Sequence, residues 1–194
     1  MSATAATLSS APLWFVSRST GVVSFALTTL TVVLGTAATQ RSLASPRWPR
    51  FATQHLHRNV SLLALGFLAV HVVATVQDSF VSVSWVNAVV PFTSPYKRFG
   101  TGLGAAALDL VVLLVVTSLL RLRMPHAAWR KVHLAAYALW PVSLAHFLLT
   151  GTDAKPGSLG FRLGLGSLAL VCAAVAVRVH TSQQLPRPVG SVAR

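Results

Sequence analysis

The sequence predicts an all-α integral membrane protein, a bundle of about five transmembrane helices. Hydrophobic residues make up 54% of the 194 residues, and the mean hydropathy is +0.66. Charged residues make up only 10%, whereas soluble domains carry about 25%. Several apolar stretches reach the roughly 20 residues that a helix needs to cross a bilayer. We therefore expect a multi-pass protein of the cell membrane, in contact with lipid.

Five stretches have the length and composition of a spanning helix. They are residues 13–38, 56–77, 102–120, 131–150 and 161–179. The third opens with GTGLGAAALD, whose glycines indicate close helix packing. We expect one membrane domain over residues 13–180, preceded by an N-terminal polar segment (1–12) and followed by a flexible cytoplasmic tail (181–194).

Basic residues gather on alternate links, which predicts the orientation. The net charge is +13. One side of the membrane is expected to hold Arg41, Arg47, Arg50, Arg58, Arg121, Arg123, Arg130, Lys131, Arg178, Arg187 and Arg194. The positive-inside rule places this side in the cytoplasm, with the N-terminus outside and the C-terminus inside. Because these charges lie between apolar stretches, anionic lipid headgroups are the expected partner, and no nucleic acid is expected.

Four of the seven histidines fall on two spans that are expected to run in the same direction. His57 and His71 lie 14 residues apart on the second span, and His133 and His146 lie 13 apart on the fourth. These spacings correspond to about 20 Å along a helix, so the two histidines of one span cannot bind the same metal ion. His57 and His133 share one depth, and His71 and His146 share another. The pattern predicts two stacked bis-histidine sites, a ligand set that suits haem iron.

The helical phase favours one of these spacings over the other. Fourteen residues return to within about 40° of the starting face of a straight helix, but thirteen miss it by about 140°. Pro141 lies between His133 and His146. Since proline disrupts a helix, we expect the fourth span to be kinked or rewound at Trp140–Pro141.

Two charges lie deep in the predicted spans, at the expected depth of His71 and His146. Arg18 and Asp109 could form an ion pair with each other. Alternatively, Arg18 could bind a haem propionate, and Asp109 could accept the second N–H of a ligating imidazole. At the other depth, three basic residues could hold haem propionates or could serve only to orient the chain: Arg58, Arg130 and Lys131.

Two segments, LHRNVSLLALGFLAVHV and WRKVHLAAYALWPVSLAHFLLTGTD, carry the histidine pairs. With these, the chain resembles the ferric reductase-like transmembrane domain family. That family includes the membrane part of NADPH oxidases, ferric-chelate reductases and the haem subunit of the periplasmic methionine sulfoxide reductase system. The resemblance implies two haem b groups, bound at His57, His133, His71 and His146, and electron transfer from the cytoplasmic to the outer face. Many members have six spans, whereas five are expected here.

The expected function is that of an oxidoreductase component without its own flavin and nicotinamide domain, since no GxGxxG or P-loop follows a strand. Whether the chain is itself an enzyme stays open. The electron donor would be a cytoplasmic flavoprotein, a quinol, or a bound flavin that the sequence does not locate. Ferric chelates, oxygen, a quinone and a periplasmic protein remain open as acceptors on the outer face. Two other functions remain open: a His-lined metal or proton transporter, and a haem-free membrane anchor subunit.

Overall fold

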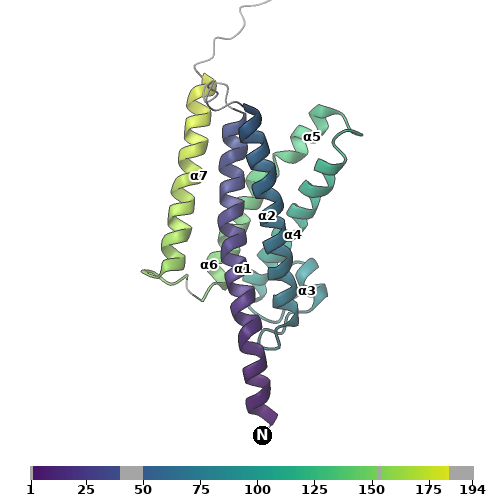
Figure 1. Cartoon of the computed structure of the whole chain (residues 1–194), viewed down its shortest axis with the longest axis vertical. Coiled ribbons are helices and arrows are strands. Elements are labelled where there is room, and N and C mark those ends of the chain that lie inside the picture. Colours follow the sequence, from purple (N-terminus) through teal and green to yellow (C-terminus); the bar gives the residue numbers. More distant parts are fainter. Residues whose placement is uncertain (1, 40–49, 153, 184–194) are drawn as a thin grey trace, which may run out of the picture.

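The computed structural model describes residues 2–39, 50–152 and 154–183, and this part of the chain contains helices and no strand. The helices form an elongated bundle (Figure 1). They are α1 (Ser2–Ala38), α2 (Arg50–Gln77), α3 (Trp85–Val89), α4 (Arg98–Leu119), α5 (His126–His133), α6 (Ala136–Thr150) and α7 (Leu159–Gln183). Five segments are long and apolar enough to cross a membrane, with α5 and α6 together forming the fourth. The prediction of five spans is confirmed.

The spans alternate in direction, so α2 and α6 run parallel to each other (Figure 1). The N-terminus and the end of α7 lie at opposite ends of the bundle. The segment predicted as a separate N-terminal stretch is helical from Ser2 and continues into the first span. Several residues used for the orientation lie outside the described residues: Arg41, Arg47, Arg187 and Arg194.

One end of the bundle carries the described basic residues of the predicted cytoplasmic side. We call it the basic end. Its exposed cations lie at the start of α2, in the α4–α5 link and on α5: Arg58, Arg121, Arg123, Arg130 and Lys131. The opposite end carries α3 and the links on either side of it (Figure 1).

The most complete packing is between α1 and its neighbours. α1 packs along α2 and also contacts α6 and α7. Val32, Trp140 and Val171 join α1, α6 and α7 in one buried cluster. Within the described residues, α2 does not pack extensively on α4 or α6. The α2 side chains that point toward α4 and α6 are therefore not covered by the backbone of either helix.

The outer surface of the bundle is strongly apolar. Large side chains are exposed along α2 and α4, including Leu62, Leu63, Val112 and Leu113. Exposed apolar area of this extent is rare on soluble monomers. It fits a surface that faces lipid.

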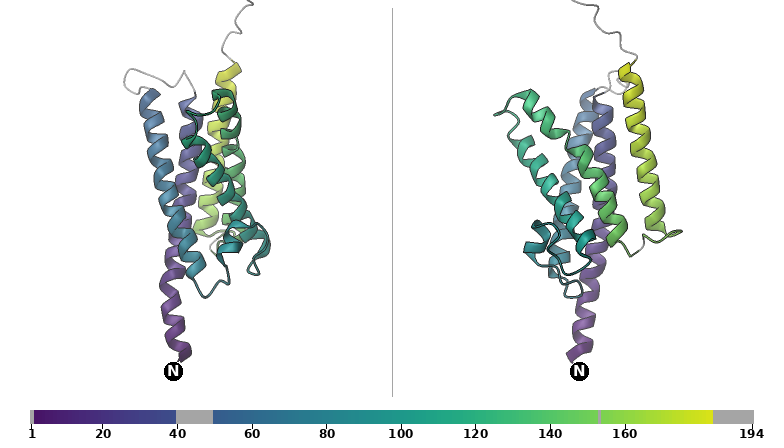
Figure 2. Two further views of the ribbon diagram at one scale, coloured as in Figure 1. Left: turned by 90° about the vertical axis from the view of Figure 1, so that its right-hand side faces the viewer. Right: turned by 180° about the vertical axis from the view of Figure 1, so that it is seen from behind.

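The fourth span is interrupted, but at a different place from the predicted one. The break lies at Leu134–Ala135, directly after His133, and α6 continues through Pro141. Figure 2 shows α5 inclined to α6. At Trp140–Pro141, where a kink or rewinding was expected, α6 is not interrupted.

Short backbone turns surround this break. The N–H groups of Ala135, Tyr137 and Ala138 each donate to the carbonyl three residues earlier, at 2.9, 3.0 and 3.0 Å. Turns of this kind rotate about 120° per residue instead of about 100°. They therefore supply part of the rotation that the 13-residue histidine spacing lacks in a straight helix.

Candidate functional site

The four histidines of the two parallel spans lie together in pairs. The ring centroids of His57 and His133 are 6.5 Å apart, with an angle of 75° between the ring planes. Those of His71 and His146 are 6.4 Å apart, with an angle of 72°. The rings expected to share a depth therefore do lie side by side, and all four side chains are half-buried.

These separations fit a metal ion held between two imidazoles. Two metal–nitrogen bonds of about 2.0–2.1 Å each take up about 4 Å, and the remainder corresponds to the two half-rings. Among the described residues, no group of three or more His, Cys, Asp or Glu side chains could hold a metal ion. Each pair could hold haem iron with its two imidazoles, and the macrocycle would supply the other donor atoms.

Three of the four rings are oriented by a backbone carbonyl. The Nδ1 atoms of His57, His71 and His146 lie 2.9, 2.7 and 2.8 Å from the carbonyl oxygens of Thr31, Ser17 and Gly100. Because a carbonyl only accepts, Nδ1 of each ring carries the proton and donates it. Each Nε2 is then left with its lone pair for a metal ion.

His133 is held differently. Its Nδ1 is buried without a hydrogen-bond partner, as is the indole Nε1 of Trp129. The two rings are stacked, with centroids 5.0 Å apart and an interplanar angle of 23°. A face-to-face aromatic contact therefore replaces the carbonyl as the neighbour of this ring.

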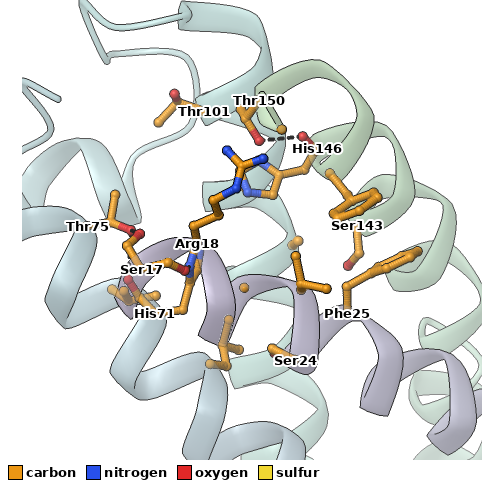
Figure 3. Close-up of a pocket in the computed structure, with 18 of the residues that line it drawn as sticks. Ser17, Arg18, Ser24, Phe25, His71, Thr75, Thr101, Ser143, His146 and Thr150 are labelled. Carbon is orange, nitrogen blue, oxygen red and sulfur yellow. Dashed lines mark hydrogen bonds between the residues drawn. The ribbon is translucent and has the colours of Figure 1, made fainter. Parts of the chain in front are cut away.

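A cavity of about 340 Å³ adjoins the His71–His146 pair. Its walls come mainly from α1, α2, α4 and α6, with further residues from α3, α7 and the links beside them, and most of the lining is apolar. In Figure 3, His71, His146 and Arg18 surround this pocket. The guanidinium of Arg18 also lies over the ring of Trp14, 5.0 Å from its centroid. The lining holds one cation (Arg18), one buried carboxylate (Asp78) and two imidazoles, and its apolar walls suit a flat macrocycle whose carboxylates could reach Arg18.

The other charges of the predicted site lie outside this cavity. Asp109 is exposed on α4 and does not line the cavity. The role suggested for it, accepting the second N–H of a ligating imidazole, belongs to the Ser17 and Gly100 carbonyls. Three basic side chains next to His57 and His133 in the chain are exposed at the basic end: Arg58, Arg130 and Lys131.

Sequence reasoning did not connect three glycines with the histidines that they face, and it interpreted Gly104 only as a helix-packing residue. A Cβ placed on Gly21, Gly35 or Gly104 would come within 2.8, 3.2 or 2.6 Å of the rings of His71, His57 and His146, respectively. A spacing in the sequence could have identified two of these glycines. Gly21 and Gly35 are separated by the same 14 residues as His57 and His71 on the neighbouring antiparallel helix.

Comparison with known proteins identifies the family of this chain. The family model described as ferric reductase like transmembrane component matches residues 20–144. The chain therefore belongs to this family, and it is a multi-pass membrane protein.

Among curated proteins, the chain is similar to the protein-methionine-sulfoxide reductase heme-binding subunit MsrQ of Caulobacter vibrioides. The two are 32% identical over 133 residues, which cover 66% of this chain and 58% of the relative. The chain thus spans less than two thirds of that relative's length. No solved structure matches the chain.

Proposed function

We propose that this chain transfers electrons across a membrane, and that each histidine pair, His57–His133 and His71–His146, holds one haem b. The observation that carries the proposal is the presence of two facing ring pairs, 6.5 and 6.4 Å across, at two depths of parallel helices. Membership of the ferric reductase-like family supports electron transfer, and the similar C. vibrioides protein is named a heme-binding subunit. Haem would supply reversible one-electron chemistry at each pair.

The chain's own residues would hold and insulate these groups. Three rings are kept as neutral imidazoles with Nε2 directed away from the carbonyl that holds Nδ1. Arg18 lines the cavity of the His71–His146 pair and would bind a carboxylate there. Phe25 and Trp140 are buried in the bundle, with ring centroids 6.5 Å apart. By their chain positions they fall between the two depths, where they would help to exclude water.

The charge distribution supports the expected direction of transfer. The positive-inside rule places the basic end in the cytoplasm. There, Arg130 and Lys131 are exposed near His133 in the chain and would receive an acidic flavoprotein, or approach a quinol donor among anionic headgroups. The acceptor would take electrons at the opposite end, beside the His71–His146 pair. Residues 13–180 would form this single electron-transfer domain.

Haem content and ligand variants test the proposal. Purified protein from haem-replete cells should give two haems per chain in a pyridine haemochrome assay. Alanine at His71 or His146 should remove the same haem, and alanine at His57 or His133 should remove the other. His55→Ala is the matched control, because its side chain is exposed and belongs to neither pair.

Two results would overturn the proposal. A chain without a reduced b-type absorption band would be a transporter or an anchor subunit instead. If His71→Ala and His146→Ala removed spectroscopically different haems, the assignment of ligand pairs would be wrong. A loss of haem in the His55→Ala control would point to general damage from substitution.

A further inference from the structure

The same arrangement of carbonyl, glycine and imidazole occurs three times in this bundle. The carbonyls that accept from His71, His57 and His146 belong to Ser17, Thr31 and Gly100. The residues four positions later are Gly21, Gly35 and Gly104. Every carbonyl that holds a paired histidine is thus followed, one helical turn later, by a glycine.

Helix geometry explains why that position matters. The carbonyl of residue i accepts from the N–H of residue i+4, and a second lone pair on its oxygen remains available. The Cα–Cβ bond of residue i+4 tilts back toward the N-terminus, which brings its side chain beside that carbonyl. A side chain there would occupy the space through which a ring from another helix reaches the oxygen.

The distances show that the space is filled by the imidazole. A Cβ on Gly21 would lie 2.8 Å from Nδ1 of His71, and one on Gly104 would lie 2.7 Å from Nδ1 of His146. Contacts under about 3 Å force one group to move, and the movable group is the ring. On Gly35 the Cβ would lie 3.2 Å from Cε1 of His57, a milder overlap.

We propose that Gly21, Gly35 and Gly104 are positioning residues, which keep a helix carbonyl open to the Nδ1–H of His71, His57 and His146. By this means they set the tautomer, the orientation and the basicity of each metal-binding imidazole. This inference rests on the proposed function, because it assigns each glycine to one haem site. Gly21 and Gly104 serve the His71–His146 site, and Gly35 serves the other.

Close contacts at glycine also occur in ordinary helix packing, as where a Cβ on Gly100 would lie 2.9 Å from Thr150, but two further observations support a role specific to the histidines. Gly66 and Gly166 lie in spanning helices, and a Cβ on either would meet nothing within 4 Å. A glycine in these spanning helices therefore does not always mark a close contact with another helix. The Nδ1 of His133, by contrast, is buried without a carbonyl partner. Its ring has Trp129 as a neighbour in place of a helix carbonyl beside a glycine.

The first test uses the haem-loaded full chain with alanine at Gly21, Gly35 or Gly104, and Gly66→Ala as the matched control. Loss of the Nδ1–H hydrogen bond makes the imidazole a weaker donor to ferric iron, so the midpoint potential should rise. We expect about a tenfold change in the one-electron reduction equilibrium, or about 59 mV. Gly21→Ala and Gly104→Ala should shift the same haem, Gly35→Ala the other, and Gly66→Ala neither.

The second test is independent of haem. Nitrogen NMR of ¹⁵N-histidine-labelled full chain, purified from haem-limited cells, reports which ring nitrogen carries the proton. His71 should show Nδ1–H in the unsubstituted protein and lose that preference in Gly21→Ala. If Gly21→Ala proves unstable, Gly35→Ala and His57 give the same test with a milder overlap.

The outcomes of the two tests distinguish the two proposals. Unchanged tautomers and unchanged potentials in the alanine variants would overturn the role of the glycines while leaving the haem sites intact. Failure of the unsubstituted chain to bind haem would overturn the proposed function, and the tautomer measurement would still decide the role of the glycines.

Discussion

The two histidine pairs have nearly the same ring separation but differ in how the rings are held. In the His71–His146 pair, both Nδ1 atoms meet a backbone carbonyl, at 2.7 and 2.8 Å. In the His57–His133 pair, only His57 does so, at 2.9 Å, while Nδ1 of His133 has no partner. Two sites of the same composition can therefore differ in rigidity, and the difference comes from one helix.

Neighbouring hydroxyl groups also distinguish His133 from the other three histidines. Thr75, Thr150 and Ser61 each donate to the carbonyl of the histidine four residues earlier, at 2.7, 2.6 and 2.7 Å. The residue four positions after His133 is Tyr137, and the helix is interrupted between them. His133 thus ends a short helix, whereas the other three histidines lie within long ones. We infer that this helix end accounts for the missing hydrogen-bond partner of Nδ1 in this ring.

The largest expected effect is loss of transmembrane transfer when one pair is broken. In vesicles of known orientation, reductant is supplied at the basic end and an impermeant ferric chelate at the other. With His71→Ala, the haem at the His57–His133 pair should still be reduced, while the chelate stays ferric. A normal rate of chelate reduction in this variant would mean that the two pairs do not act in series.

A substitution at a residue that lies between the two histidine pairs should lower the stability of both haem sites to the same extent. Trp140 donates from Nε1 to the hydroxyl of Thr29 at 3.0 Å, and both residues are buried. Thr29→Val leaves this donor unsatisfied, which should cost about 1–3 kcal/mol of stability. The thermal midpoints for loss of each haem, followed by absorbance, should fall together. A fall at one site alone would show that Thr29 supports that site and not the shared core.

Haem retention compares the two pairs within the unsubstituted protein. Groups that orient a metal ligand typically contribute about 10–100-fold to affinity. The His57–His133 site lacks one of them, so its haem should transfer to excess apomyoglobin about tenfold faster than the other. Difference spectra during the transfer, assigned with the His→Ala variants, give both rates. Equal rates would mean that the missing hydrogen bond has no energetic consequence.

The smallest expected effect concerns the aromatic neighbour of His133. Trp129 stacks on this ring at 5.0 Å, and aromatic pairs contribute about 0.5–1.5 kcal/mol. Trp129→Ala should therefore speed haem loss from the His57–His133 site several-fold and leave the other site unchanged. Trp129→Phe, which keeps a stacked ring, is the control and should stay near the rate of the unsubstituted protein. An equal effect of both substitutions would point away from stacking.

The sequence by itself determined the five spans and the two depths of the histidines. Hydropathy sets where a helix can cross a bilayer, and a rise of 1.5 Å per residue converts spacing into depth. Both are local properties of the chain, so they can be predicted without knowledge of the other helices. The pairing of His57 with His133 and of His71 with His146 followed from depth alone, and the ring distances agree with it.

Only the tertiary structure decided how each ring is held. The break after His133 lies between α5 and α6, and each of these two helices packs on α4, a distant segment of the chain. The carbonyls of Ser17, Thr31 and Gly100 belong to other helices than the histidines they hold. Which carbonyl faces which ring depends on the rotation of two helices about their own axes. That rotation is set by packing between distant segments, and no local pattern in one helix specifies it.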